Sequence, residues 1–132
     1  MIYLDTSLAL AHLLAEDRAP AASIWSQTLV SSRLLEYELW TRINARGLDR
    51  TYAEALRELV NSVALLELAP AVLVRALEPF PVPVRTLDAI HLASADFLRT
   101  QHQAVEIATY DERLLSAARK MGFPISHYAT DP

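Results

Sequence analysis

The chain opens with the stretch Met1-Ile2-Tyr3-Leu4-Asp5-Thr6-Ser7, which joins a short apolar run directly to a cluster of helix-capping side chains. A short apolar run is typical of a buried strand, and Asp, Thr and Ser are favoured immediately before a helix. The sequence therefore predicts a strand over residues 2–4 and a helix over residues 8–14. A strand that leads straight into a helix is the first half of a β-α unit, in which the next strand lies parallel to the first.

The same arrangement recurs towards the other end of the chain. Residues 105–108, Val-Glu-Ile-Ala, form a second candidate strand, and the residues from Thr109 to Glu112 form a capping box. In a capping box, a hydroxyl and a carboxylate three residues apart bond the first free amides of a helix. We expect this helix to end near Gly122 and residues 124–126 to form a last edge strand.

Helical and extended segments alternate between these two junctions. In chain order we predict a helix over 21–27, a strand over 28–30, helices over 34–46 and 51–65, a strand over 66–69, and helices over 70–77 and 87–100. The helix over 34–46 is expected to stop at Gly47, and a capping box from Thr51 to Glu54 is expected to open the next helix. Prolines at positions 79, 81 and 83 predict an extended connector, since each disfavours helical geometry in the residue before it. Strands that alternate with helices pair in parallel through right-handed crossovers. The predicted fold is therefore a single three-layer α/β/α domain over residues 1–132, with a central parallel sheet of four to five strands.

The composition excludes several classes of protein. The 132 residues include no Cys and only two Gly, so neither a Cys-ligated zinc site nor a Gly-rich phosphate-binding loop can be drawn. The sequence contains no signal-peptide pattern and no stretch of about 20 apolar residues, so we predict a cytoplasmic protein that does not enter a membrane. Twelve Lys and Arg against 16 Asp and Glu give a net charge of −4, which argues against indiscriminate binding to nucleic acid.

Four carboxylates are predicted to meet at the carboxyl edge of the sheet, where open parallel sheets bind their ligands. Asp5 and Asp111 follow strands, Glu38 lies on the helix after the strand over 28–30, and Asp88 lies in the first turn of its helix. Two carboxylates about 5 Å apart repel each other by roughly 3 kcal/mol at an effective dielectric constant of about 20. Such a cluster needs shared protons or a cation, and ligands that are all oxygen favour Mg²⁺ or Mn²⁺ over Zn²⁺.

Each carboxylate also has an ordinary structural explanation. Asp5 and Asp111 are suited to capping the helices that follow them, and Asp88 is suited to the positive end of a helix dipole. Glu38 is spaced to form an ion pair with Arg42, one turn further along the same helix. Singly, these residues decide nothing. The case for a site rests on their joint placement along one edge.

Four motifs follow one another along nearly the whole chain. They are Asp5-Thr6-Ser7, Ser32-Arg33-Leu34 followed by Glu38, Leu87-Asp88-Ala89-Ile90-His91-Leu92-Ala93, and Ala108-Thr109-Tyr110-Asp111-Glu112-Arg113-Leu114 leading to Ala117-Ala118 and Gly122. In these motifs and their order, the chain resembles the PIN-domain ribonucleases, and in particular the VapC-type toxins of bacterial toxin–antitoxin pairs. Residues 51–84 match the family least.

The resemblance implies a PIN-like domain that acts as a toxic, Mg²⁺-dependent endoribonuclease, with Mn²⁺ as a substitute metal. Its catalytic, metal-holding acids would be Asp5, Glu38, Asp88 and Asp111. The metal would acidify a water molecule and neutralise charge on the scissile phosphate. The resemblance also implies an RNA substrate, a homodimer and a cognate antitoxin that blocks the site. The alternative is a non-catalytic PIN-fold module that binds RNA or a protein partner without cutting.

Four further residues are secondary candidates for this site. The hydroxyls of Thr6 and Thr109 are expected either to support the metal or the phosphate, or only to cap helices. Arg42, with Arg46 one turn later, is expected either to hold RNA phosphates or to lie on a salt-bridged helix face. His91, one turn after Asp88, is a candidate acid–base. Because the four acids need no histidine, it is expected instead to support the site or to pack beneath it.

Several large apolar residues are predicted to belong first of all to the core. They are Leu10, Leu13, Leu14, Trp25 and Trp40. Any of them left exposed, near the first and third helices, would form an apolar groove for a helix of the antitoxin.

Overall fold

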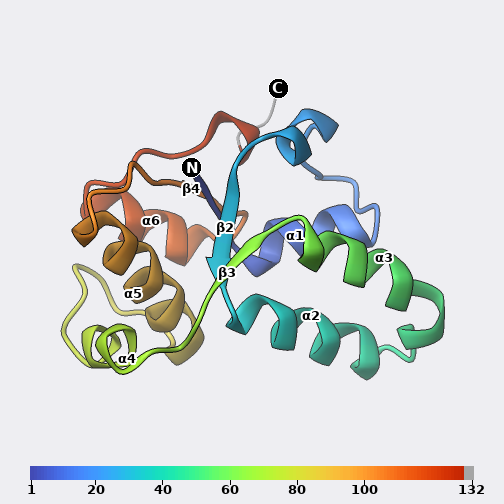
Figure 1. Cartoon of the computed structure of the whole chain (residues 1–132), viewed down its shortest axis with the longest axis horizontal. Coiled ribbons are helices and arrows are strands. Elements are labelled where there is room, and N and C mark those ends of the chain that lie inside the picture. Colours follow the sequence, from blue (N-terminus) through green and yellow to red (C-terminus); the bar gives the residue numbers. More distant parts are fainter. Residues whose placement is uncertain (130–132) are drawn as a thin grey trace.

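Four parallel strands form the central sheet of the computed structural model, which describes residues 1–129 (Figure 1). Their order across the sheet is β3-β2-β1-β4. Their bounds are β1 (Ile2–Leu4), β2 (Leu29–Ser32), β3 (Ala64–Leu66) and β4 (Glu106–Ala108). Every pairing between neighbours is parallel. The prediction of a parallel sheet of four to five strands is confirmed.

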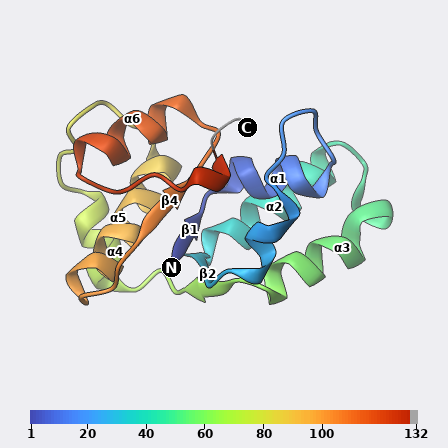
Figure 2. The ribbon, with the colours of Figure 1, turned by 90° about the horizontal axis from the view of Figure 1, so that it is seen from above.

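Helices cover both faces of this sheet, so the predicted three-layer α/β/α arrangement is also confirmed. They are α1 (Thr6–Leu13), α2 (Leu34–Ala45), α3 (Asp49–Asn61), α4 (Pro70–Ala76), α5 (Thr86–Thr100) and α6 (Glu112–Lys120). α1, α2 and α3 lie on one side and α5 and α6 on the other, with α4 packed against α5 (Figures 1 and 2). Across residues 1–129, every helix is too short or too polar to cross a membrane.

The buried apolar residues divide between two cores, one on each face of the sheet. Ile2 and Leu4 belong to the core beneath α1, α2 and α3, whereas Tyr3 between them belongs to the core beneath α5 and α6. β2 alternates in the same way, with Leu29 on the first side and Val30 on the second. Because successive side chains of a strand point to opposite faces, the central strand β1 contributes to both cores despite its short length.

The tight connection between α2 and α3 depends on Gly47. This residue has a φ of +66°, in the left-handed region that favours glycine. The amide of the next residue, Leu48, donates to the carbonyl of Ile43 at 2.9 Å, which is the hydrogen bond of a Schellman motif. The predicted stop of the helix at Gly47 is confirmed. The capping box predicted at Thr51 is wrong, because this turn starts α3 already at Asp49, with Leu48 as an N-cap that makes no side-chain bond.

Two segments contain less regular structure than predicted. Residues 21–27 form only a 3₁₀ turn, Ala22–Ser26, because no side chain caps its first amides and an uncapped run this short does not sustain an α-helix. The edge strand predicted over 124–126 is reduced to a single parallel bridge between Ile107 and Ile125.

The segment between α3 and α5 is shifted slightly from its prediction. β3 lies two residues before the predicted strand over 66–69, because α3 ends at Asn61 instead of reaching residue 65. Pro70 then begins α4 as expected. The proline-containing connector over residues 78–85 holds no helix or strand, as the sequence predicts.

Candidate active site

The carboxyl ends of β1 and β4 open into a pocket of about 700 Å³ that is lined by the four carboxylates singled out from the sequence. Asp5 directly follows β1, and Asp111 follows β4 after two residues. Glu38 lies on α2, and Asp88 lies in the first turn of α5. α2 and α5 cover opposite faces of the sheet, so the pocket forms where the two helical layers meet at the sheet edge.

Asp5 caps a helix and lines the pocket at the same time. Its Oδ2 accepts hydrogen bonds from the Ser7 amide at 3.3 Å, the Ser7 hydroxyl at 2.6 Å and the Thr109 hydroxyl at 2.8 Å. Its Oδ1 makes no hydrogen bond within residues 1–129 and lies 3.8 Å from Nε2 of His91. The capping role and a ligand role therefore use different oxygens and do not exclude each other.

Thr109 links the carboxylates of Asp5 and Asp111. Its hydroxyl donates to Asp5 and accepts the backbone amide of Asp111 at 3.0 Å. Asp111, not Thr109, is the N-cap of α6, and its Oδ1 accepts the amides of Arg113 and Leu114. The capping box predicted from Thr109 is therefore wrong, because this hydroxyl bonds Asp5 instead of the helix. Oδ2 of Asp111 has no hydrogen bond to any described residue.

Glu38 is held by hydrogen bonds from two other elements. Its Oε1 accepts the hydroxyl of Thr6, on α1, at 2.8 Å and pairs with Nε2 of His91, on α5, at 2.6 Å. The ion pair with Arg42 that the sequence spacing allowed is not formed. Glu38 therefore belongs to the interior of the site and not to a salt-bridged helix surface.

The carboxyl of Asp88 has a raised pKa, as expected where several acidic groups lie close together. Partial burial raises the pKa of its carboxyl, and the negative charges of Asp111 and Asp5 raise that pKa further. A backbone hydrogen bond at Arg85 acts in the opposite direction but does not cancel these effects. The repulsion expected from the sequence is thus present in the folded protein.

His91 lies beneath the pocket with only 2% of its surface exposed. Its Nδ1 is 2.8 Å from the hydroxyl of Tyr3, in the middle of β1. Burial alone would lower the pKa of His91, but the hydrogen bond with Glu38 and the charges of Asp5 and Glu38 raise it above its ordinary value. Burial also raises the pKa of Tyr3, so its phenol stays protonated. No pattern in the sequence indicates the contact between His91 and Tyr3.

The oxygen donors of the pocket suit a hard divalent cation, but their side chains do not converge on one point as the ligands of a bound metal do. Within residues 1–129, no three acidic or histidine side chains stand where they hold a metal ion in their present rotamers. The chemistry of the donors nevertheless fits Mg²⁺ or Mn²⁺, since Asp5, Glu38 and Asp111 each retain a carboxylate oxygen without a hydrogen-bond donor. Metal binding would require rotations of these side chains that bring the oxygens together.

An arginine rim, formed by Arg42, Arg46 and Arg85, lines the same pocket as the carboxylates. All three side chains are exposed, and none forms an ion pair with a described residue. By contrast, Arg33 and Arg75 are paired with acids away from the pocket. Sequence reasoning found the two arginines of α2 but missed Arg85. Its position directly before the α5 helix, which brings Asp88 to this edge, was the available signal.

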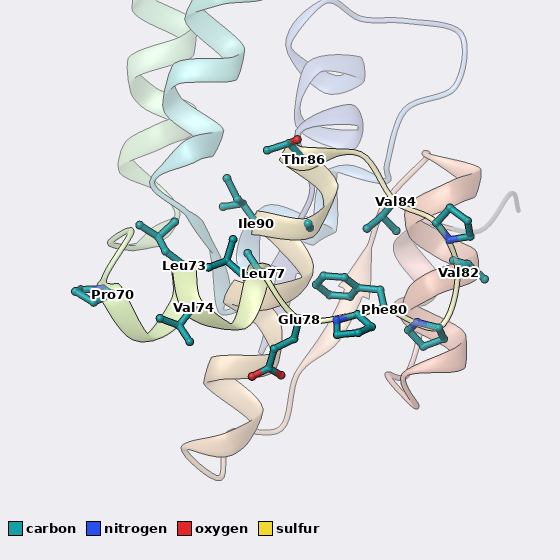
Figure 3. A pocket seen from close by; sticks show the side chains of 15 residues that line it. Pro70, Leu73, Val74, Leu77, Glu78, Phe80, Val82, Val84, Thr86 and Ile90 are labelled. Atoms are coloured by element: carbon teal, nitrogen blue, oxygen red, sulfur yellow. The ribbon is translucent and has the colours of Figure 1, made fainter.

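A larger pocket, of about 940 Å³, lies between α4, α5 and the connector that joins them. Figure 3 shows Leu73 of α4 and Ile90 of α5 around it, with Leu77, the C-cap of α4, and Phe80 from the connector. Leu77 is 86% exposed, and an open apolar surface of this kind is typical of a contact with another protein. The sequence did not indicate this surface.

The apolar residues that the sequence assigned to the core are largely inside the protein. Leu10 and Leu13 are buried, and Leu14, Trp25 and Trp40 pack partly exposed against the core. A small pocket of about 260 Å³ lies beside Leu13 and Trp25, near the first and third helices.

An α/β/α domain with carboxylates gathered at the carboxyl edge of a short parallel sheet has the architecture of the PIN-like class. The family model of the PIN domain matches residues 2–120. The chain therefore belongs to the PIN-domain family.

Named relatives cover nearly the whole chain. Ribonuclease VapC47 of Mycobacterium tuberculosis (strain CDC 1551 / Oshkosh) is 34% identical over 130 residues, which are 93% of each chain. Ribonuclease VapC46 of Mycobacterium tuberculosis (strain ATCC 25618 / H37Rv) is 32% identical over 127 residues, covering 94% of this chain and 95% of the relative. The crystal structure of Mycobacterium tuberculosis VapC20, titled a sarcin-ricin loop cleaving toxin, superposes over 100% of both chains with a TM-score of 0.70. At 20% identity, this last likeness supports the fold alone.

Proposed function

We propose that the protein is a metal-dependent endoribonuclease and the toxin of a toxin–antitoxin pair. The observation that carries the proposal is the meeting of Asp5, Glu38, Asp88 and Asp111 in one pocket at the carboxyl edge of the sheet. Relatives more than 30% identical over almost the full length are named ribonuclease VapC. Nucleases of this family depend on a divalent metal, and the oxygen donors of the pocket favour Mg²⁺, with Mn²⁺ as a substitute.

Asp5, Asp88 and Asp111 would hold the metal, with Glu38 as a further ligand or as the group that orients the attacking water. When bound, the metal supplies acidification of water and neutralises charge on the phosphate. Asp5 is the stiffest of these ligands, because Ser7 and Thr109 fix its Oδ2 and leave Oδ1 for the site. Asp111 is fixed in the same way by the amides of α6.

The arginine rim would hold the RNA. Arg42, Arg46 and Arg85 have no carboxylate partner in the described structure although acids line the same pocket. Guanidinium groups bind phosphate oxygens bidentately, so they would hold phosphates on either side of the one that is cut. Thr6, bonded to Glu38, supports the acid and not the RNA in this arrangement.

We also infer a cognate antitoxin and a homodimer as protein partners, and the cytoplasm as the place of action. The apolar surfaces described above would serve protein contacts of this kind. A pocket of four carboxylates would further attract a cationic side chain of the antitoxin, which would compete with the metal.

The test is cleavage of RNA by the purified protein in EDTA and in a titration of Mg²⁺ and Mn²⁺. Cleavage that requires the metal and disappears in Asp111→Asn is the expected result. The alternative, a PIN module that binds RNA or a partner without cutting, is favoured if the folded protein binds RNA but leaves it intact at every metal concentration. If the protein does cleave RNA, sequencing the RNA ends formed after brief induction identifies the target.

A further inference from the structure

A buried chain of hydrogen bonds joins the middle of the sheet to the acidic pocket. It runs from the hydroxyl of Tyr3 to Nδ1 of His91 over 2.8 Å, and from Nε2 of His91 to Oε1 of Glu38 over 2.6 Å. Tyr3 is 1% exposed and His91 is 2% exposed. Tyr3 belongs to the core beneath α5 and α6, and His91 lies on α5, whereas Glu38 lies on α2. The chain of bonds therefore crosses from one helical layer of the fold to the other.

One of these bonds has a direction that follows from the groups themselves. A carboxylate only accepts hydrogen bonds, so Nε2 of His91 must carry the proton that it shares with Glu38. Nδ1 accepts the Tyr3 hydroxyl when the ring is neutral and donates to the same oxygen when the ring is doubly protonated, so the bond holds the ring in either state. Tyr3 therefore fixes the ring orientation of His91, and the ring presents a donor to Glu38.

Both donors to Glu38 reach the same oxygen. Thr6 bonds Oε1 at 2.8 Å, as His91 does, whereas Oε2 makes no hydrogen bond to any described residue. Glu38 has a longer and more flexible side chain than the aspartates, whose positions are fixed by helix amides and hydroxyls. It lies mid-helix, where no free amide is available to orient it.

We propose that His91, oriented by Tyr3, is a positioning residue that fixes Oε1 of Glu38 and so presents Oε2 to a divalent cation in the acidic pocket. This inference rests on the proposed function and assigns a role to two residues that touch neither metal nor RNA. Partners that orient a ligand from outside its coordination sphere typically change metal affinity 10- to 100-fold when they are removed.

The test is a double-mutant cycle on Mn²⁺ affinity, measured by calorimetry or electron paramagnetic resonance on the full chain without RNA. His91→Leu removes the donor at Glu38, and we expect Mn²⁺ to bind about 10-fold more weakly or worse. In the Glu38→Gln background, where the positioned carboxylate is already absent, the same substitution should change affinity by less than about twofold.

Two milder variants keep the test decisive if His91→Leu does not fold. In His91→Gln, an amide N–H takes approximately the place of Nε2–H, so Mn²⁺ affinity should return close to wild type. Tyr3→Phe removes one hydroxyl and should give an affinity between wild type and His91→Leu. His12→Gln is the matched control, because His12 also pairs through a ring nitrogen, with Trp25, but outside the pocket. It should leave Mn²⁺ affinity unchanged.

The inference would be overturned if His91→Leu lowered Mn²⁺ affinity equally in the wild-type and Glu38→Gln backgrounds, or if His91→Gln did not restore the affinity. Either result would mean that His91 has only a structural role. Wild-type protein that binds no Mn²⁺ would instead overturn the metal site of the proposed function, and the inference with it.

Discussion

Thr109 and Asp5 lie at the ends of two neighbouring strands and are joined by a hydrogen bond of 2.8 Å from the threonine hydroxyl to the carboxylate. The same hydroxyl accepts the amide of Asp111, so one side chain sets the distance between two candidate ligands. Thr109→Val keeps the shape but removes the hydroxyl. We expect it to weaken metal binding and RNA cleavage about 10- to 100-fold.

The matched control for this change is Thr109→Ser, which keeps the hydroxyl and should retain most of the activity. Metal titration of the cleavage rate separates the two variants. A fully active Thr109→Val protein would show that the link between Asp5 and Asp111 does not matter for the chemistry.

Asp5→Asn should abolish cleavage without unfolding the protein. The amide oxygen of Asn still accepts the bonds from Ser7, and Asn is as good an N-cap as Asp, so the melting temperature should stay within a few degrees of wild type. What the variant loses is the charge that a metal requires. Growth after induction in a host without the antitoxin, with circular dichroism as the folding check, tests this. A folded variant that arrests growth as wild type does would remove Asp5 from the metal site.

The raised pKa of Asp88 predicts how metal-free stability depends on pH. Above its ordinary pKa of 3.8, this carboxyl keeps its proton longer in the folded than in the unfolded state, because burial and the charges of Asp111 and Asp5 oppose its ionisation. The folded state therefore binds more protons in that window, and stability contributed by this group falls as pH rises through it. In EDTA, Asp88→Asn should flatten this decline and raise the melting temperature at neutral pH.

A bound divalent metal ion should relieve the same repulsion between the carboxylates. A ligand that binds only the native state stabilises it by about 2.7 kcal/mol when its concentration is 100 times its dissociation constant. Mg²⁺ should therefore raise the melting temperature of the wild-type protein. The increase should be smaller for Asp88→Asn. Asp49→Asn, on α3 away from the pocket, is the control and should behave as wild type. Unfolding curves that do not respond to metal in any of these proteins would count against the metal site.

The arginine rim predicts a measurable salt dependence of RNA binding. Each phosphate contact on single-stranded RNA contributes about 0.7 to the slope of log affinity against log salt. In the Asp5→Asn background, which prevents cutting, the substitutions Arg42→Ala, Arg46→Ala and Arg85→Ala should each lower the slope by about this amount. Arg50→Ala, on α3 outside the pocket, should not. Fluorescence anisotropy at several salt concentrations measures the slope, and unchanged slopes in all three variants would place the RNA elsewhere.

The prediction of an inhibitory partner is tested by co-expression with an adjacent small reading frame. The complex should lose RNA cleavage, and excess Mg²⁺ should restore part of it by displacing a cationic side chain from the carboxylates. A partner that binds but leaves cleavage unaffected would argue for a ribonuclease that is not controlled in this way.

The sequence was informative where structure is decided locally. The strand-to-helix junctions at Asp5 and Asp111 depend on capping chemistry that a few neighbouring residues specify. Both carboxylates are the N-caps of the helices that follow them, although the capping box was predicted to start at Thr109 and not at Asp111. The parallel order of the strands then brings their carboxyl ends to one edge. That topology is why four acids far apart in the chain could be expected in the same place.

The sequence was uninformative where the outcome depends on packing between layers. The bond between Tyr3 and His91 requires knowledge of which face of β1 the tyrosine occupies and how α5 is rotated against it, and no local pattern specifies either. The capping box at Thr51 failed for a related reason, since the turn at Gly47 had already begun the helix. Local signals compete, and the tertiary arrangement selects among them.

The position of β1 between β2 and β4 also determines when, during synthesis of the chain, the pocket can form. β1 pairs with β4, whose residues follow about a hundred positions later, and Asp111 comes later still. Contacts of such long sequence separation form late, after the intervening chain has been made. A growing chain on the ribosome therefore carries Asp5 long before it has a pocket, and a polypeptide released before β4 is complete should be harmless to the cell that makes it.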